Sequence, residues 1–200
     1  MTEPAGVAAL DPEDEARAAL YGLIAQLFYA PPDQGVLAQV INAALFEGGD
    51  AGLSLRWREL VERCRSAVPV QLENEHTELF VGTGRAAVTP YLIHYLVERS
   101  TDNPLVQLRK QLAEWGISRR AHTTEPEDHV ASVCEVMRLA IAVQHRSLDE
   151  QRTFFDRHVY EGGVAFCDAV IASPKADFYR VIAAFAGEFF RIERNAFDMA

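Results

Sequence analysis

Carboxylates and an imidazole cluster where a helix is predicted to begin. The segment Thr124–Ala140 reads TEPEDHVASVCEVMRLA. Its acidic and histidine residues are Glu125, Glu127, Asp128 and His129. Carboxylates bind arginine side chains through charge-assisted hydrogen bonds, so this cluster is a candidate site for a cationic ligand. The alternative, that the acids only complement the positive end of the helix dipole, stays open.

A glycine-bearing loop is the second candidate. Gly82 to Pro90 separates two helical patterns and includes Gly84. Apolar and aromatic residues flank the loop: Leu79, Phe80, Pro90, Tyr91 and Tyr95. Such side chains suit a groove for an apolar segment. The Gly-x-Gly pattern follows no predicted strand and precedes no Gly-Lys-Ser/Thr, so it is only a weak signal for a nucleotide.

Catalytic and metal-binding patterns are sparse. Glu73-x-x-His76 matches half of a di-iron motif, but a second Glu-x-x-His is absent, and only Asp128, His129 and His158 could substitute for it. No Ser-His-Asp or Cys-His arrangement stands out. We therefore expect a protein that is not an enzyme and holds no metal or other cofactor. Weak guanine-nucleotide binding, or a metal site, is the alternative from a different class.

Composition narrows the class of protein further. The 200 residues are 49% hydrophobic and 24% charged, which favours one folded domain over residues 1–200, with a flexible N-terminus over residues 1–12. A net charge of −10 disfavours nucleic acid as a partner. No apolar run spans a bilayer, and no signal-peptide pattern opens the chain. Three widely spaced cysteines fit buried thiols in a reducing cytoplasm.

Apolar residues in the first third of the chain recur at three- and four-residue spacing, the period of amphipathic helices. The first predicted helix follows Asp11-Pro12 and ends at Pro31-Pro32. A second ends before Gly48-Gly49, and a third, shorter one begins at Trp57. The apolar positions of the first two are Ala16, Leu20, Leu23, Ile24, Leu27, Phe28, Leu37, Val40, Ile41, Ala44 and Leu45.

Two further stripes lie in the middle of the chain. Apolar residues from Leu105 to Trp115 form one helix, which Gly116 closes. The other helix is predicted to open with Pro126 at its first position and to continue to Ile141.

The last third predicts two more helices. Ser147 and Glu150 form a capping box for a helix from about Asp149 to Ile171, in which Gly162-Gly163 indicates a kink or close helix packing. Ser173-Pro174 is predicted to start the final helix. Because no strand of period two appears anywhere, the fold class is all-α, a single globular helical domain.

The combination of these motifs resembles the TorD/DmsD/NarJ family of redox-enzyme maturation chaperones. The matching pattern is E-x-x-x-LF-x-G-x-G, then PY, then E-P-E-D-H, then Q-x-x-FF-x-x-H. The residues that carry it are Glu75, Leu79, Phe80, Gly82, Gly84, Pro90, Tyr91, Glu125, Pro126, Asp128, His129, Gln151, Phe154, Phe155 and His158. The resemblance extends over nearly the whole chain.

This resemblance implies a TorD-like helical bundle that catalyses no reaction. It implies a cytoplasmic chaperone that binds the twin-arginine leader or the apo form of the catalytic subunit of a molybdenum-cofactor oxidoreductase, until the cofactor is inserted. A client without a leader is the alternative. We expect a monomer or a helix-swapped dimer that neither binds nucleic acid nor inserts into a membrane. The expected client-binding residues are Leu79, Phe80, Gly82, Gly84, Pro90, Tyr91, Tyr95, Glu125, Pro126, Asp128 and His129.

Overall fold

The protein is described by a computed structural model over residues 10–43, 50–82, 86–96, 103–118 and 126–199. All regular secondary structure in these ranges is helical, which confirms the all-α prediction. The α-helices are α1 (Pro12–Tyr29), α2 (Gln34–Asn42), α3 (Ala51–Arg65), α4 (Pro69–His76), α5 (Pro104–Glu114), α6 (Val130–Ala142), α7 (Leu148–Phe155), α8 (Glu161–Ala172) and α9 (Phe178–Met199). The short elements are the π-helical turns η1 (Thr77–Val81) and η3 (Asp156–Tyr160) and the 3-10 helix η2 (Leu92–Tyr95).

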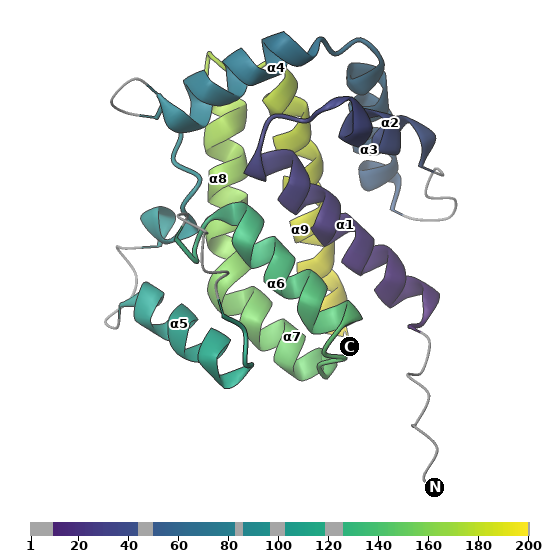
Figure 1. Cartoon of the computed structure of the whole chain (residues 1–200). Coiled ribbons are helices and arrows are strands. Elements are labelled where there is room, and N and C mark those ends of the chain that lie inside the picture. Colours follow the sequence, from purple (N-terminus) through teal and green to yellow (C-terminus); the bar gives the residue numbers. More distant parts are fainter. Residues whose placement is uncertain (1–9, 44–49, 83–85, 97–102, 119–125, 200) are drawn as a thin grey trace, which may run out of the picture.

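Two helix pairs form the centre of the molecule. α1 and α6 run alongside each other, and α8 packs on α9 behind them (Figure 1). α3 covers α9, α2 packs on α3, and α4 crosses one end of the bundle. α5 lies beside α6 and α7 at the opposite end. No helix in the described ranges is both long and apolar enough to cross a membrane.

An aromatic cluster fills the core where α1, α8 and α9 meet. The rings of Phe28 and Phe166 lie 5.0 Å apart, and those of Phe80 and Tyr179 lie 5.1 Å apart, both edge to face. Edge-to-face pairs add about 0.5–1.5 kcal/mol each to the free energy of burial. The three cysteines, Cys64, Cys134 and Cys167, are buried free thiols, as predicted.

One buried ion pair ties the first helix to the last. The Glu193 side chain on α9 is buried and accepts hydrogen bonds from both Nε and Nη2 of Arg17, at 2.9 and 3.0 Å. The hydroxyl of Tyr21 donates to the same carboxylate at 2.9 Å. A buried charge is tolerated only when its partners satisfy it, so these contacts fix α1 against α9.

Two predicted helix starts are wrong because side chains other than those expected cap the helices. α6 begins at Val130 rather than Pro126, and the imidazole of His129 accepts the N–H of Ala131. α9 begins at Phe178 rather than at Ser173-Pro174. Its first backbone N–H groups donate to the carboxylate of Glu75, which arrives from α4.

Boundaries near the start of the chain also differ. α3 begins at Ala51, not Trp57, and at 15 residues it is longer than the 9-residue α2, because Asp50 caps it by accepting from Gly52 and Leu53. α2 ends at Asn42, and the predicted Ala44 and Leu45 lie outside the described residues. Pro90-Tyr91 does not open an α-helix, since only the 3-10 helix η2 follows.

Other local predictions are confirmed. α1 begins after Asp11 and ends at Tyr29, before the proline pair. Gly116 follows α5 with a positive φ of 67°, a conformation in which glycine avoids the strain of a side chain. The Ser147–Glu150 capping box is present at α7. Of the two interpretations of Gly162-Gly163, close packing is correct: a Cβ on Gly163 would lie 3.0 Å from the Phe190 ring.

Removal of the Glu193 carboxylate should destabilise the protein strongly. We expect Glu193→Ala to lower the free energy of unfolding by about 3–5 kcal/mol, because it leaves Arg17 buried without its anion. Urea unfolding monitored by circular dichroism measures this loss. The matched control is Asp198→Ala on the same helix, whose exposed pairs with Arg152 and Arg194 should contribute about 1 kcal/mol or less. Equal losses in the two variants would contradict the assignment.

Candidate functional site

The two predicted site segments are joined by a short antiparallel bridge between Tyr91 and His129. The Leu92 N–H donates to the Asp128 carbonyl, and the Val130 N–H donates to the Pro90 carbonyl, both at 2.9 Å. These bonds satisfy backbone groups that lie between helices and have no partner within one. The bridge therefore places Pro90-Tyr91 directly beside Asp128-His129, although nearly forty residues separate them in sequence.

The burial of the Asp128 carboxylate carries a desolvation cost. Its side chain is buried, and burial raises the pKa of the carboxyl above the ordinary aspartate value. Hydrogen bonds from the backbone N–H groups of Asp128 and Ile93, and to a smaller degree the charge of Arg109, lower this pKa, while the charge of Glu127 raises it slightly. The carboxylate thus holds the start of η2, while its charge is only partly compensated. A cation placed next to it would favour the ionised form.

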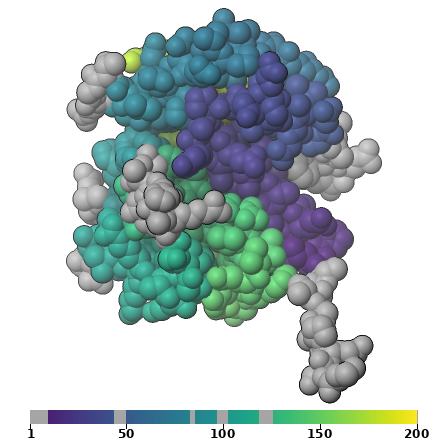
Figure 2. All heavy atoms as spheres, viewed as in Figure 1, coloured from purple at the N-terminus to yellow at the C-terminus, as the bar shows by residue number. Residues whose placement is uncertain are grey.

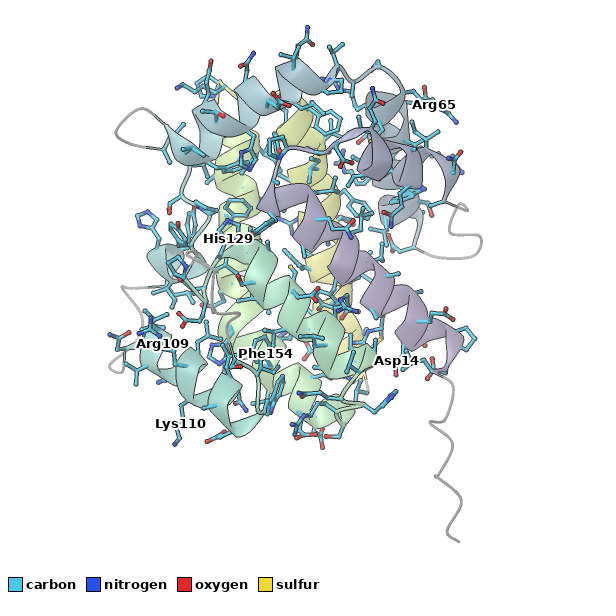
Figure 3. The ribbon with its side chains drawn as sticks, viewed as in Figure 1. Asp14, Arg65, Arg109, Lys110, His129 and Phe154 are labelled. Carbon is cyan, nitrogen blue, oxygen red and sulfur yellow. The ribbon has the colours of Figure 1, made fainter. Side chains whose placement is uncertain are left out.

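His129 lies at the start of α6 (Figure 3), and its ring contacts two tyrosine rings. Its ring centroid is 5.8 Å from that of Tyr91 and 6.5 Å from that of Tyr29, in edge-to-face geometry. Because Nδ1 accepts the Ala131 N–H, the neutral imidazole carries its proton on Nε2. The histidine therefore acts as a helix cap and as the centre of an aromatic row, and its ring is fixed in orientation.

The 3-10 helix η2 packs directly against a glycine of α8. A Cβ on Gly162 of α8 would lie 2.9 Å from both the Cβ and the carbonyl oxygen of Leu92. Only a residue without a side chain lets the two backbones approach so closely. The hydroxyl of Tyr95 donates to the Thr89 carbonyl at 2.9 Å, which fixes the other end of η2.

The remaining predicted residues are placed differently. Leu79 and Phe80 are buried in the core, where the Phe80 ring contacts those of Phe166 and Tyr179. Gly82 ends η1 with a positive φ of 66°. Gly84 and Glu125 lie outside the described residues. Pro126 precedes the bridge, and its carbonyl accepts the His129 N–H at 3.3 Å.

The Q-x-x-FF-x-x-H motif serves the core. The amide of Gln151 donates to the Arg146 carbonyl at 2.9 Å, and Phe154 stacks on Trp115 at 5.1 Å. His158 is buried against Phe154, and burial, with a smaller effect of Arg157, lowers the pKa of its imidazole to about 4. This neutral histidine belongs to the packing that holds α5 against α7.

A groove opens next to the bridge, and its lining contains none of the apolar and aromatic residues that were predicted to form one. It lies between α1, α5 and α6, with a volume of about 940 Å³. Figure 2 shows this face, with α1 in purple, α5 in teal and α6 in green. Its lining includes Gly22, Gln26, Tyr29, Leu112, Ile117, Glu127, Glu135 and Leu139. Tyr29, 59% exposed, lines the groove and is in ring contact with His129. Its position at the end of the first predicted helix, before Pro31-Pro32, is a signal that sequence reasoning could have used.

Two ion pairs border this groove. Arg109 of α5 binds Glu127 with its Nη2 3.1 Å from Oε2, and Arg138 binds Glu135 within α6 through two bonds of 2.7 and 2.8 Å. The rest of the lining is mostly small or apolar. The site as a whole can bind a ligand that combines cationic groups with an apolar segment. Among the described residues, no group of three or more His, Cys, Asp or Glu is arranged to hold a metal ion.

Residues 47–168 match the family model described as nitrate reductase delta subunit. The chain belongs to this family. The match covers more than half of the sequence and includes the bridge, the groove wall α5 and the start of α8. It confirms the resemblance to the TorD/DmsD/NarJ family of redox-enzyme maturation chaperones.

The chain is also similar to curated proteins of this family. It is 24% identical over 205 aligned positions to the chaperone protein TorD of Vibrio cholerae serotype O1, covering 92% of this chain and 93% of that protein. It is 27% identical over 112 residues to the chaperone protein TorD of Photobacterium profundum, and that alignment spans about half of each chain, 50% and 52%.

A solved structure has the same fold. The chain superposes with a TM-score of 0.54 on a crystal structure assigned as a redox enzyme maturation protein from Archaeoglobus fulgidus. The two are 18% identical, and the alignment covers 98% of this chain and 99% of the other. The whole helical arrangement, rather than one motif, is therefore shared.

The stability of an Asp128→Asn variant should depend on pH in a defined direction. A carboxyl whose pKa is raised by folding destabilises the native state once pH exceeds the unfolded-state value, near 3.9. Asparagine keeps an oxygen acceptor for Ile93 without the charge. We expect the variant to be more stable than the unmodified protein at neutral pH, and the difference to shrink as pH falls through the raised native pKa toward about 3.

Thermal unfolding over this pH series measures the effect. The matched control is Asp168→Asn, an exposed residue of α8 that pairs with Arg191 at 3.3 Å. A destabilised Asp128→Asn protein at neutral pH would show that the carboxylate is structural, in contradiction to the assignment.

Proposed function

We propose that this chain is a chaperone for a molybdenum-cofactor oxidoreductase. It binds the twin-arginine leader or the apo form of the catalytic subunit in the cytoplasm, and it protects the client until the cofactor is inserted. The chain itself catalyses no reaction. The membership of the delta-subunit family and the similarity to TorD chaperones support this assignment.

The leader-binding part of this proposal rests on one observation. The buried carboxylate of Asp128 lies next to the aromatic rings of Tyr91 and His129. Arginine side chains pair with carboxylates and stack on aromatic rings, and the bridge presents both within one site. A partly compensated buried carboxylate gains more from an arriving cation than an exposed one does, because little water screens the pair. The site therefore offers the paired arginines of a leader both a carboxylate and aromatic rings.

The apolar part of a leader needs a different surface. The groove next to the bridge offers small and aliphatic side chains over three helices. A recognition mode in which an apolar helix lies in a groove fits this arrangement. A client without a leader would engage the groove but not the carboxylates, so the two forms of the proposal differ in their dependence on Asp128.

Affinity purification of the tagged protein from its native cells should recover its client. We expect mass spectrometry to identify the catalytic subunit of a molybdenum-cofactor oxidoreductase with its leader intact. The Asp128→Asn variant should recover at least about tenfold less of it, because a buried charge pair is lost. The Asp168→Asn variant serves as control.

Each other outcome has a definite meaning. Equal recovery by Asp128→Asn and the unmodified protein would move the assignment to a leaderless client. Recovery of no oxidoreductase subunit by the unmodified protein would contradict the chaperone assignment itself.

A further inference from the structure

The groove between α1, α5 and α6 has a chemical polarity along its length. The end next to the bridge carries Tyr29 and Glu127, and Tyr29 is in ring contact with His129. Farther along α5 and α6 the lining includes aliphatic Leu112, Val136 and Leu139, beside the Glu135–Arg138 pair, whose two charges compensate each other. A ligand that fits this order has a charged group at one end and an apolar stretch behind it.

The dimensions of the groove match a short helical segment. Its α6 wall runs from Ala131 to Leu139, which at 1.5 Å per residue is about 12 Å, or roughly two helical turns. Small side chains come from all three walls, as at Ala25 of α1, Ala113 of α5 and Ala131 of α6. Small residues let a further helix approach closely, since interaxial distance depends on the side chains at the contact.

The acidic end is already occupied by a cation of this chain. Arg109 pairs with Glu127 from the neighbouring helix, through Nε at 3.3 Å and Nη2 at 3.1 Å. The two partners differ in exposure: the Glu127 side chain is 13% exposed, whereas the Arg109 side chain is 53% exposed. The acid is therefore fixed in the wall of the groove, and the arginine reaches it from solvent.

The helix that carries Arg109 is attached at its other end. The Trp115 ring stacks on Phe154 at 5.1 Å, the Trp115 carbonyl accepts from Gln144 at 2.9 Å, and the guanidinium of Arg146 lies over the indole. Arg109, two turns earlier on α5, can exchange its partner while these contacts persist. Lys110, the next residue, pairs with Glu114 on the exposed side of α5 and does not line the groove (Figure 3).

We propose that Arg109 is an internal competitor for Glu127 in the groove between α1, α5 and α6, which the proposed function already assigns to the apolar segment of the client. In the free protein Arg109 holds the position that a guanidinium of the client takes in the complex. Binding then exchanges one ion pair for another, so the charge contributes selectivity with little net gain in affinity. This inference rests on the proposed function.

Removal of the competitor should strengthen binding. The probe is a synthetic fluorescent peptide with two adjacent arginines followed by an apolar stretch of about eight residues, the length of two helical turns. We expect Arg109→Gln to bind this peptide about two- to fivefold more tightly than the unmodified protein does, the range that an exposed ion pair supports. Fluorescence anisotropy measures both dissociation constants.

Matched controls isolate the charge exchange. Lys110→Gln removes the same charge from the same helix and should leave the affinity unchanged. A second peptide, with two glutamines in place of the arginines, should bind Arg109→Gln and the unmodified protein equally. The double variant Arg109→Gln with Glu127→Gln should lose the gain. A gain shared by Lys110→Gln or by the glutamine peptide would overturn the competition, because it would reflect net charge alone.

A bulky residue in the wall tests the location. Ala113→Trp on α5 fills the groove and should weaken binding of the arginine peptide at least about tenfold. Ala38→Trp on α2, also an exposed helical position, should have no effect. Unchanged binding by Ala113→Trp would show that the peptide lies elsewhere.

Failure of the inference differs from failure of the proposed function. If the unmodified protein prefers the arginine peptide and Arg109→Gln changes nothing, the competitor is disproved while leader binding stands. If the unmodified protein binds neither peptide, leader binding fails and the inference fails with it.

Discussion

Two backbone hydrogen bonds, Leu92 N–H to Asp128 and Val130 N–H to Pro90, are the constraint on which the site depends. They join two segments whose backbone N–H and C=O groups lie between helices and have no partner within a helix. The rest of the regular secondary structure in the described residues is helical. Once the bridge forms, the rings of Tyr91 and His129 meet edge to face and the Asp128 carboxylate is enclosed. The close approach of η2 to Gly162 of α8 holds Leu92, which donates one of the two hydrogen bonds, in place.

Buried and half-buried acids perform opposite tasks in different parts of this molecule. Glu193 is enclosed with a bidentate arginine and a tyrosine hydroxyl, and Glu75 accepts three backbone N–H groups at the start of α9. Both stabilise the fold because their partners compensate the loss of water. Asp128 has less compensation, so burial dominates and raises its pKa. That difference separates a structural acid from one that suits an incoming cation.

Helical periodicity predicted most elements of the fold, since apolar faces repeat whether or not their neighbours are known. The start of α9 escaped prediction because its cap, Glu75, is 102 residues away from Asp177, whose N–H it accepts, and no local pattern contains such a pair. At the site, the family resemblance grouped Pro90-Tyr91 and Asp128-His129 among the client-binding residues, and the structure brings these two pairs together. Leu79 and Phe80, which were grouped with them, are buried. The groove escaped prediction because periodicity identifies the faces of α1 and α5, not the helices they meet. Client binding at these residues stays a prediction.

The central claim is that a client leader binds at the bridge and along the adjoining groove. Hydrogen exchange with mass spectrometry, on the protein alone and in complex with the purified leader of its client, tests this most directly. Slower exchange in the complex at the amides of residues 91–93 and 129–132 and along α5 is the predicted result. Protection confined to the opposite face, where α3 and α9 meet, with no change at the bridge or α5, would contradict the account.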